Sequence, residues 1–223
     1  MKKTILGLNI LLVALCLFLM IRYDWRGGLF LKGATASSFV FLGLFNAIYS
    51  WTTKSAHRAF ALWMAIGLGV CMAGDIVLNL SFIPGAAIFA LGHGFYCLAQ
   101  GKLIRYRRSD LLFVAVVFVF SLAILLLTPS LHFGSALMAV IVYVYALVIS
   151  LMVGKSIANF YRQRSWATAL MMVGAILFFF SDLMLLLCYF AGAPKITDTL
   201  CLYTYFPGQC LLAHAIFHAA NQS

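Results

Sequence analysis

Apolar and polar positions alternate in long blocks, with apolar runs separated by short polar segments along the whole chain. Each run is close to the roughly 20 residues that an α-helix needs to cross the hydrocarbon core of a bilayer. The pattern predicts eight membrane-spanning helices, at residues 4–21, 32–50, 59–81, 84–104, 110–128, 133–153, 166–190 and 199–220. Pro207 lies inside the last span, where we expect a kink or local unwinding.

The composition leads to the same class of protein. Of the 223 residues, 65% are hydrophobic and 9% are charged, and the mean hydropathy is +1.07. Soluble globular domains are about 45–50% apolar and about 25% charged, and disordered chains are rich in charge and poor in hydrophobic residues. We therefore expect an all-α integral membrane protein, in which residues 1–223 form a single transmembrane domain of about eight helices.

The distribution of positive charge predicts the orientation of the chain. There are 15 Lys and Arg residues against five acids. With a cytoplasmic amino terminus, 11 of the 15 lie in cytoplasmic segments, in agreement with the positive-inside rule. Both termini are therefore predicted to be cytoplasmic, in a multi-pass protein of the bacterial inner membrane. Because the charge is explained by topology, no nucleic-acid partner is expected. The first apolar run is expected to be a retained span, because no small-residue cleavage site follows it.

The acidic residues are few enough to be considered one by one. All five are aspartates, and the chain contains no Glu. Asp24, Asp110 and Asp198 lie at span ends or in loops and are expected to be solvated. Asp75 and Asp182 lie deep in the third and seventh spans, each 16 residues after the predicted start. A carboxylate at such a depth costs at least about 2.5–3.5 kcal/mol on insertion scales, so it usually faces a protein interior or a wet cavity and serves a function.

The matching depth of Asp75 and Asp182 predicts that they share one site in the outer half of the bilayer. Two carboxyls in one site of low dielectric favour one protonated and one ionised group, which is an acid–base pair. The alternative is that each aspartate only joins helices by hydrogen bonds. Further polar side chains are expected at a compatible depth: Asn79, His93, Tyr96, Ser181, Tyr205 and Gln209.

A metal centre is not expected from the sequence. The six cysteines form no CxxC pair. His214 and His218 have a spacing that could hold a metal from one helix face, but no third ligand accompanies them.

A weak internal repeat accompanies the two aspartates. Residues at matching positions are offset by 107: Gly67, Asp75 and Tyr96 recur as Gly174, Asp182 and Tyr203. Duplication of a four-helix unit preserves the orientation of its helices, so the domain could consist of two parallel four-helix repeats.

Four blocks of sequence around these residues resemble the YhhN-like lysoplasmalogenases, a family of multi-pass membrane proteins. The blocks are residues 74–78 with 92–96, 145–152, 174–182 and 204–209. The resemblance implies hydrolysis of the vinyl ether bond of lysoplasmalogen, which gives a fatty aldehyde and a glycerophospho-alcohol. It also implies that two membrane-embedded aspartates, here Asp75 and Asp182, are catalytic.

The residues are suited to that chemistry. Cleavage of a vinyl ether begins with protonation of carbon and forms an oxocarbenium ion, which resembles the cation that paired carboxyls stabilise in glycosidases. His93, Tyr96, Tyr205 and Gln209 are expected to orient water or a glycerol hydroxyl, and Lys32 to bind the phosphate. The scheme needs no cofactor, and its expected partners are the lysophospholipid substrate and membrane lipids.

A proton-coupled transporter is the main alternative, because paired intramembrane aspartates and a repeated helix unit also fit that class. A structural or lipid-binding membrane protein is the third. A carrier predicts a polar path that reaches both membrane faces, whereas the enzyme predicts a cavity closed toward the cytoplasm. Few polar residues are apparent on the cytoplasmic side of the aspartates, which favours the enzyme.

Overall fold

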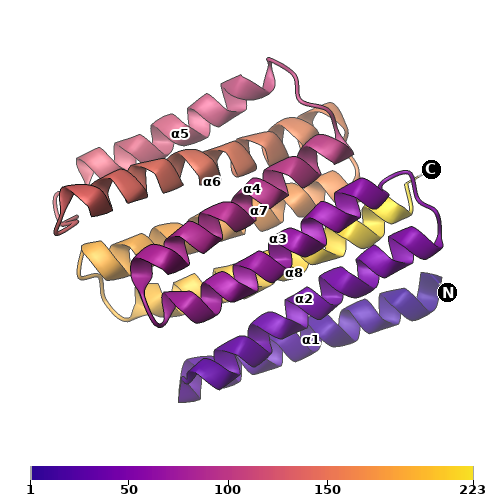
Figure 1. Cartoon of the computed structure of the whole chain (residues 1–223), viewed down its shortest axis with the longest axis horizontal. Coiled ribbons are helices and arrows are strands. Elements are labelled where there is room, and N and C mark those ends of the chain that lie inside the picture. Colours follow the sequence, from indigo (N-terminus) through magenta and orange to yellow (C-terminus); the bar gives the residue numbers. More distant parts are fainter. Residues whose placement is uncertain (1, 223) are drawn as a thin grey trace.

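The computed structural model describes residues 2–222, and in that part of the chain it has eight α-helices and no β-strand (Figure 1). The helices follow the eight predicted spans in order, so the prediction of an all-α bundle is confirmed. Their bounds are α1 Lys2–Arg26, α2 Leu29–Thr52, α3 Arg58–Leu78, α4 Phe82–Leu103, α5 Asp110–Leu127, α6 Ala136–Arg162, α7 Trp166–Phe190 and α8 Ile196–Ala220.

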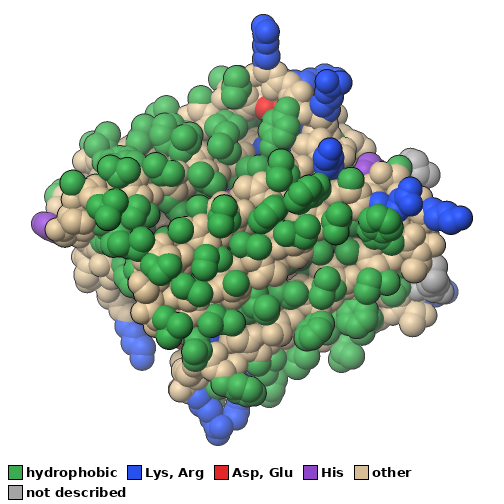
Figure 2. Space-filling model, in the orientation of Figure 1, with side chains coloured by type: hydrophobic (Ala, Val, Ile, Leu, Met, Phe, Trp, Pro, Cys, Tyr) green, Lys and Arg blue, Asp and Glu red, His purple; other side chains and the backbone are tan. Residues whose placement is uncertain are grey.

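All eight helices are long and apolar enough to cross a membrane. Large hydrophobic side chains are exposed along them, and Figure 2 shows such side chains over most of the face in view, with Lys and Arg gathered toward the two ends of the helices. An apolar belt between charged ends is the surface of a protein that is solvated by lipid. The chain is therefore a multi-pass membrane protein.

The two termini lie at the same end of the bundle (Figure 1). Loops 53–57, 104–109 and 163–165 are at that end, which we call the terminal end. The opposite end, called the distal end, holds the connections from α1 to α2, α3 to α4, α5 to α6 and α7 to α8. This arrangement agrees with the sidedness used in the charge count, while the placement of the terminal end in the cytoplasm stays a prediction.

Two helix pairs, α3 with α4 and α7 with α8, pack along most of their length, and α2 and α6 lie against them. The helices α1 and α5 lie at opposite edges of the bundle (Figure 1). Glycine permits the closest approach in the α7–α8 pair, because a Cβ at Gly174 would lie 2.9 Å from the Gly208 carbonyl oxygen. The core is formed by buried residues of α1–α4 and α6–α8.

Several helix bounds differ from the predicted spans by a few residues or more. The helix α6 continues to Arg162 rather than ending near residue 153, because Lys155 is buried and ion-paired instead of marking a solvated end. The helix α3 ends at Leu78, which makes Asn79 its C-cap. The helix α8 is continuous through Pro207, so the local unwinding considered there does not occur.

The tyrosines of the proposed repeat are in different environments. Tyr96 is fully buried, whereas Tyr203 is 38% exposed. The repeat of four helices therefore stays a prediction.

Candidate active site

A cavity of about 300 Å³ lies at the distal half of the bundle and is lined by side chains of α1–α4, α7 and α8. Both deep aspartates, Asp75 of α3 and Asp182 of α7, line it. The prediction from their depth that they meet in one place therefore agrees with the structure. The remaining lining residues are Tyr23, Asp24, Gly27, Lys32, Leu78, Asn79, Phe89, Ser181, Leu185, Tyr189, Lys195, Asp198, Cys201, Leu202 and Tyr205.

Asp75 is held by groups from α2 and α8. Its Oδ2 accepts a hydrogen bond of 2.6 Å from the Tyr205 hydroxyl, and the Lys32 ammonium lies 3.9 Å from its Oδ1. The Gln209 amide donates to the same Tyr205 hydroxyl at 3.2 Å. Asp75 is 2% exposed. A buried carboxyl is retained only where such partners replace its hydration, so the α8 residues fix its position and Lys32 gives it a nearby positive charge.

Asp182 is held by groups from α4 and α6. Its Oδ2 accepts a hydrogen bond of 2.6 Å from Tyr145 and lies 3.4 Å from His93 Nε2. The His93 Nε2 and the Tyr145 hydroxyl are themselves 2.9 Å apart. Both contacts to the Asp182 carboxyl reach Oδ2, and no side chain among residues 2–222 makes a hydrogen bond to Oδ1.

The other residues expected at the site lie in two layers. Four of them line the cavity: Lys32, Asn79, Ser181 and Tyr205. The Asn79 side chain donates to the backbone oxygen of Asp75 at 2.7 Å rather than to its carboxyl, as a C-cap residue does.

The second layer is fully buried beneath the cavity and consists of His93, Tyr96 and Gln209. Tyr96 donates to the Gln209 Oε1 at 2.7 Å, so it supports the residues that hold Asp75. We therefore find Tyr96 and Gln209 placed to position other side chains rather than to touch a bound molecule.

Tyr145 was not among the residues expected at the site, although it contacts both Asp182 and His93. It lies within the run IVYVYALV, where a tyrosine has no signal that separates it from neighbouring Tyr143. The one feature of the sequence that singles out Tyr145 is its position in the block 145–152, which resembles the YhhN-like family. Asp24 and Asp198 were expected only as solvated boundary residues, but both line the cavity, together with Lys195.

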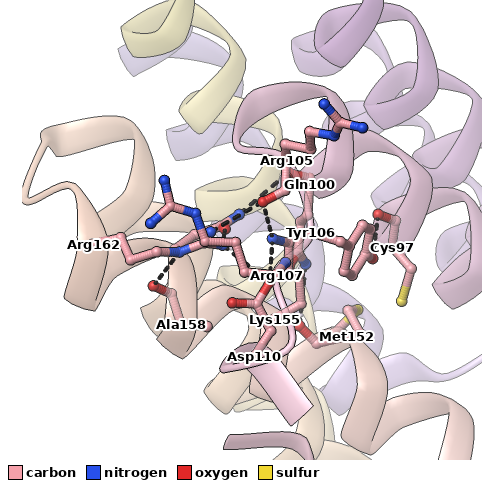
Figure 3. A network of polar contacts seen from close by, with 11 residues as sticks. Cys97, Gln100, Arg105, Tyr106, Arg107, Asp110, Met152, Lys155, Ala158 and Arg162 are labelled. Carbon is pink, nitrogen blue, oxygen red and sulfur yellow. Dashed lines mark hydrogen bonds and ion pairs between the residues drawn. The ribbon is translucent and has the colours of Figure 1, made fainter.

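A second polar cluster lies at the terminal end (Figure 3). Asp110 is 2% exposed, and its Oδ2 accepts from the Lys155 ammonium at 2.8 Å and from Arg162 at 3.0 Å. The expectation that Asp110 is solvated was therefore wrong, because an ion pair across 45 residues of sequence removes it from water. The Tyr106 ring lies 4.2 Å from the Lys155 ammonium. Burial raises the pKa of the Tyr106 phenol, which donates to the Cys97 carbonyl as a neutral group.

Buried polar side chains also lie between the two clusters. Gln100 is fully buried and donates to the Met152 carbonyl, and Asn159 donates to the Gln100 carbonyl. Asn159 in turn accepts from Arg162 at 3.1 Å. The expectation of few polar groups on this side of the aspartates was wrong, because Gln100 and Asn159 face neighbouring helices rather than lipid.

Residues 2–222 contain no group of three or more His, Cys, Asp or Glu side chains that could hold a metal ion. His214 and His218 lie near each other, with ring centroids 4.9 Å apart, but their neighbours are the aromatic rings of Phe217 and Trp166.

Comparison with known proteins identifies one family. The family model described as the YhhN family matches residues 30–216, a range that includes both aspartates and all the side chains that hold them. No curated protein and no solved structure matches the chain.

Proposed function

The chain belongs to the YhhN family, and from that premise we propose that it hydrolyses the vinyl ether bond of lysoplasmalogens with Asp75 and Asp182. The products are a fatty aldehyde and a glycerophospho-alcohol. The observation that supports this proposal most directly is the pairing of two carboxyls from different helices across one cavity at the distal half of the bundle.

The reaction consumes one water and returns every proton it uses. One carboxyl protonates the vinyl ether at the carbon farther from oxygen, which places positive charge on the adjacent carbon and the ether oxygen. Water adds to that adjacent carbon and gives its proton to the other carboxyl. The second carboxyl then gives this proton to the glycerol oxygen as the hemiacetal breaks its bond to that oxygen and the alcohol leaves. The first carboxyl takes the proton of the hemiacetal hydroxyl as the aldehyde forms, so both carboxyls return to their starting states. Paired carboxyls supply both the donor and the acceptor in this sequence.

The surroundings of the two carboxyls support separate roles for them as proton donor and proton acceptor. Each is fixed by a tyrosine hydroxyl at 2.6 Å, which stabilises its position in a site with little water. They differ in their second partner, because Asp75 has the Lys32 ammonium and Asp182 has the His93 imidazole. Lys32 lines the cavity as well, so its ammonium is placed to attract the phosphate of a lysophospholipid head group.

The test is aldehyde release by the purified protein in nanodiscs supplied with lysoplasmenylethanolamine. Asp75→Asn and Asp182→Asn are each expected to reduce the rate by at least about 100-fold, because each removes a proton donor or acceptor. Arg108→Gln is the control, since it also replaces a charged group by an amide, and Arg108 is exposed in a loop at the terminal end and lines none of the three cavities described in this structure. All variants must keep the thermal unfolding midpoint of the wild type. Absence of aldehyde release by folded wild-type protein would reject the proposed reaction.

A proton-coupled carrier is the second candidate function. The observation that favours it is the pair of buried amides, Gln100 and Asn159, between the aspartates and the terminal end. Proteoliposomes with an internal pH indicator test it, because a carrier moves protons across the membrane with its solute and a hydrolase does not. We further propose that the protein lies in the bacterial inner membrane with the terminal end in the cytoplasm.

A further inference from the structure

Asp182 lies where three cavities meet. The first is the polar cavity described above. The second, the α4–α7 pocket, measures about 50 Å³ and is lined by Leu78, Phe82, Ala86, Phe89, Ile141, Val142, Tyr145, Asp182, Leu185 and Leu186. The third, the α5–α7 pocket, measures about 70 Å³ and is lined by Ser121, Ile124, Leu125, Val142, Tyr145, Ala146, Ile149, Phe179, Asp182, Leu183 and Leu186.

The three cavities are adjacent, because neighbouring cavities share lining residues. Leu78, Phe89, Asp182 and Leu185 line both the polar cavity and the α4–α7 pocket. The two smaller pockets share four residues in turn, which are Val142, Tyr145, Asp182 and Leu186. Asp182 is the one residue that lines all three cavities, and its side chain is 13% exposed.

The polarity of the three cavities changes at Asp182. The polar cavity carries charged side chains of both signs, among them Lys32, Lys195 and Asp198. The two smaller pockets are lined by aliphatic and phenylalanine side chains apart from Asp182, Tyr145 and Ser121. A charged cavity beside apolar pockets suits an amphiphile with a zwitterionic head group and one hydrocarbon chain. The head group then lies against charged side chains, and the hydrocarbon chain lies against apolar ones.

We propose that the two apolar pockets bind the hydrocarbon chain of a single-chain lysophospholipid whose head group occupies the polar cavity. This inference rests on the proposed function and specifies where its substrate lies. The α5–α7 pocket runs along α6 from Val142 to Ile149, about 10 Å at 1.5 Å per residue. Ile124 at its α5 wall is partly exposed, so the end of a longer chain leaves the pocket into the bilayer.

The placement has a consequence for the reaction. In a lysoplasmalogen the vinyl ether is the bond that joins the glycerol to the hydrocarbon chain, so it falls at the boundary between the polar and apolar compartments. Asp182 forms that boundary, whereas Asp75 lines the polar cavity but neither apolar pocket. Asp182 therefore contacts the reacting bond from the chain side, and Asp75 faces it from the head-group side.

Photocrosslinking tests the position of the chain without requiring hydrolysis. The probe is a 1-O-alkyl lysophosphoethanolamine with a diazirine in the alkyl chain, whose saturated ether cannot be cleaved by carbon protonation. Mass spectrometry of labelled peptides is expected to find the label at the walls of the two pockets, which belong to α3, α4, α5, α6 and α7. Excess unlabelled lysophospholipid is expected to remove it. Label spread over exposed side chains of α1, or label that competitor does not reduce, would overturn the proposal.

A matched pair of variants gives a second measurement. Ile124→Trp fills the α5–α7 pocket from its α5 wall, whereas Leu126→Trp places the same side chain two residues away at a position that is 70% exposed and lines neither pocket. Ile124→Trp is expected to lower the specific label and raise the KM for a long-chain substrate about tenfold or more, as expected when several buried methylenes lose their site. Leu126→Trp is expected to change neither.

The outcomes separate the two proposals. If the wild type is labelled in the pockets but releases no aldehyde, the chain site is supported and the vinyl ether reaction is rejected. If the wild type releases aldehyde but Ile124→Trp keeps both its label pattern and its KM, the reaction is supported and the chain site is rejected.

Discussion

The buried ion cluster at the terminal end allows a sharp test of the structure. Asp110 is the only acid in contact with two cations among residues 2–222, since its Oδ2 accepts from Lys155 and Arg162. Replacing it with Asn keeps the size of the side chain and removes the negative charge. We expect Asp110→Asn to lower the free energy of unfolding by about 3–5 kcal/mol, the usual effect of leaving a buried charge without its partner.

The magnitude follows from the burial of the pair. Lys155 is fully buried, and Asp110 is 2% exposed. In Asp110→Asn the Lys155 ammonium loses the carboxylate charge and keeps only neutral partners, which are the Arg105 carbonyl at 3.4 Å, the Tyr106 ring and the new amide oxygen. For a chain of this length each kcal/mol lowers the unfolding midpoint by about 2–4 °C, so the expected decrease is roughly 6–20 °C.

A thiol-reactive dye measures this midpoint, because all six cysteines are buried or partly buried in the folded protein. The double variant Asp110→Asn/Lys155→Met is expected to recover much of the loss, since no ammonium is then left unpaired. The control Asp198→Asn is expected to leave the midpoint unchanged. A decrease below about 2 °C for Asp110→Asn, within the range of surface substitutions, would refute the reasoning.

The remaining predictions concern the site and the topology. Tyr145→Phe removes the hydroxyl that contacts both Asp182 and His93, and is expected to lower kcat/KM for aldehyde release by about 10- to 100-fold while the unfolding midpoint changes little. Gln100→Leu is expected to leave aldehyde release unchanged, whereas a carrier that used this amide would lose proton flux. A carboxyl-terminal green fluorescent protein is expected to fluoresce and a carboxyl-terminal alkaline phosphatase to be inactive, and the opposite pair of results would reverse the orientation.

Much of the fold follows from the sequence because lipid imposes a simple rule. Each apolar run must satisfy its own backbone hydrogen bonds, so it forms a helix of membrane length. That rule also set the depth of Asp75 and Asp182, and two residues at one depth on helices of the same direction can share a cavity. The same rule places Tyr205 at a compatible depth, and its spacing of four residues puts Gln209 on the same helix face. The structure agrees, because Gln209 donates a hydrogen bond to the Tyr205 hydroxyl.

The contacts that the sequence did not reveal are those that depend on helix packing. The span predicted at residues 133–153 leaves Lys155 outside the membrane, yet Lys155 is buried through an ion pair with Asp110 on another helix. Tyr145 reaches Asp182 because α6 lies against both α4 and α7. The order of helices around the bundle decides both contacts, and hydropathy carries no information about that order.

The two aspartates have corresponding surroundings in the two halves of the chain. Each follows by eight residues a glycine, Gly67 or Gly174, that packs against a glycine carbonyl of the next helix. Asp75 on α3 is contacted from α2 and α8, and Asp182 on α7 is contacted from α6 and α4. If each helix of α1–α4 is paired with the helix four places later, α2 corresponds to α6 and α4 to α8. The helices that contact Asp75 then correspond to the helices that contact Asp182. We therefore propose that the domain consists of two parallel four-helix repeats whose α3 and α7 correspond.

Such a duplication explains how a membrane protein can bring two carboxyls together and still make them different. The repeated helices place Asp75 and Asp182 at the same depth, because equivalent positions in parallel units have equal depth. Identical surroundings would give two carboxyls with the same tendency to hold a proton. The surrounding helices differ in their side chains, with Lys32 from α2 near one carboxyl and His93 from α4 near the other. The proposed acid–base pair requires that difference, so in the proposed duplication the divergence of the partner side chains would give the two aspartates their separate roles.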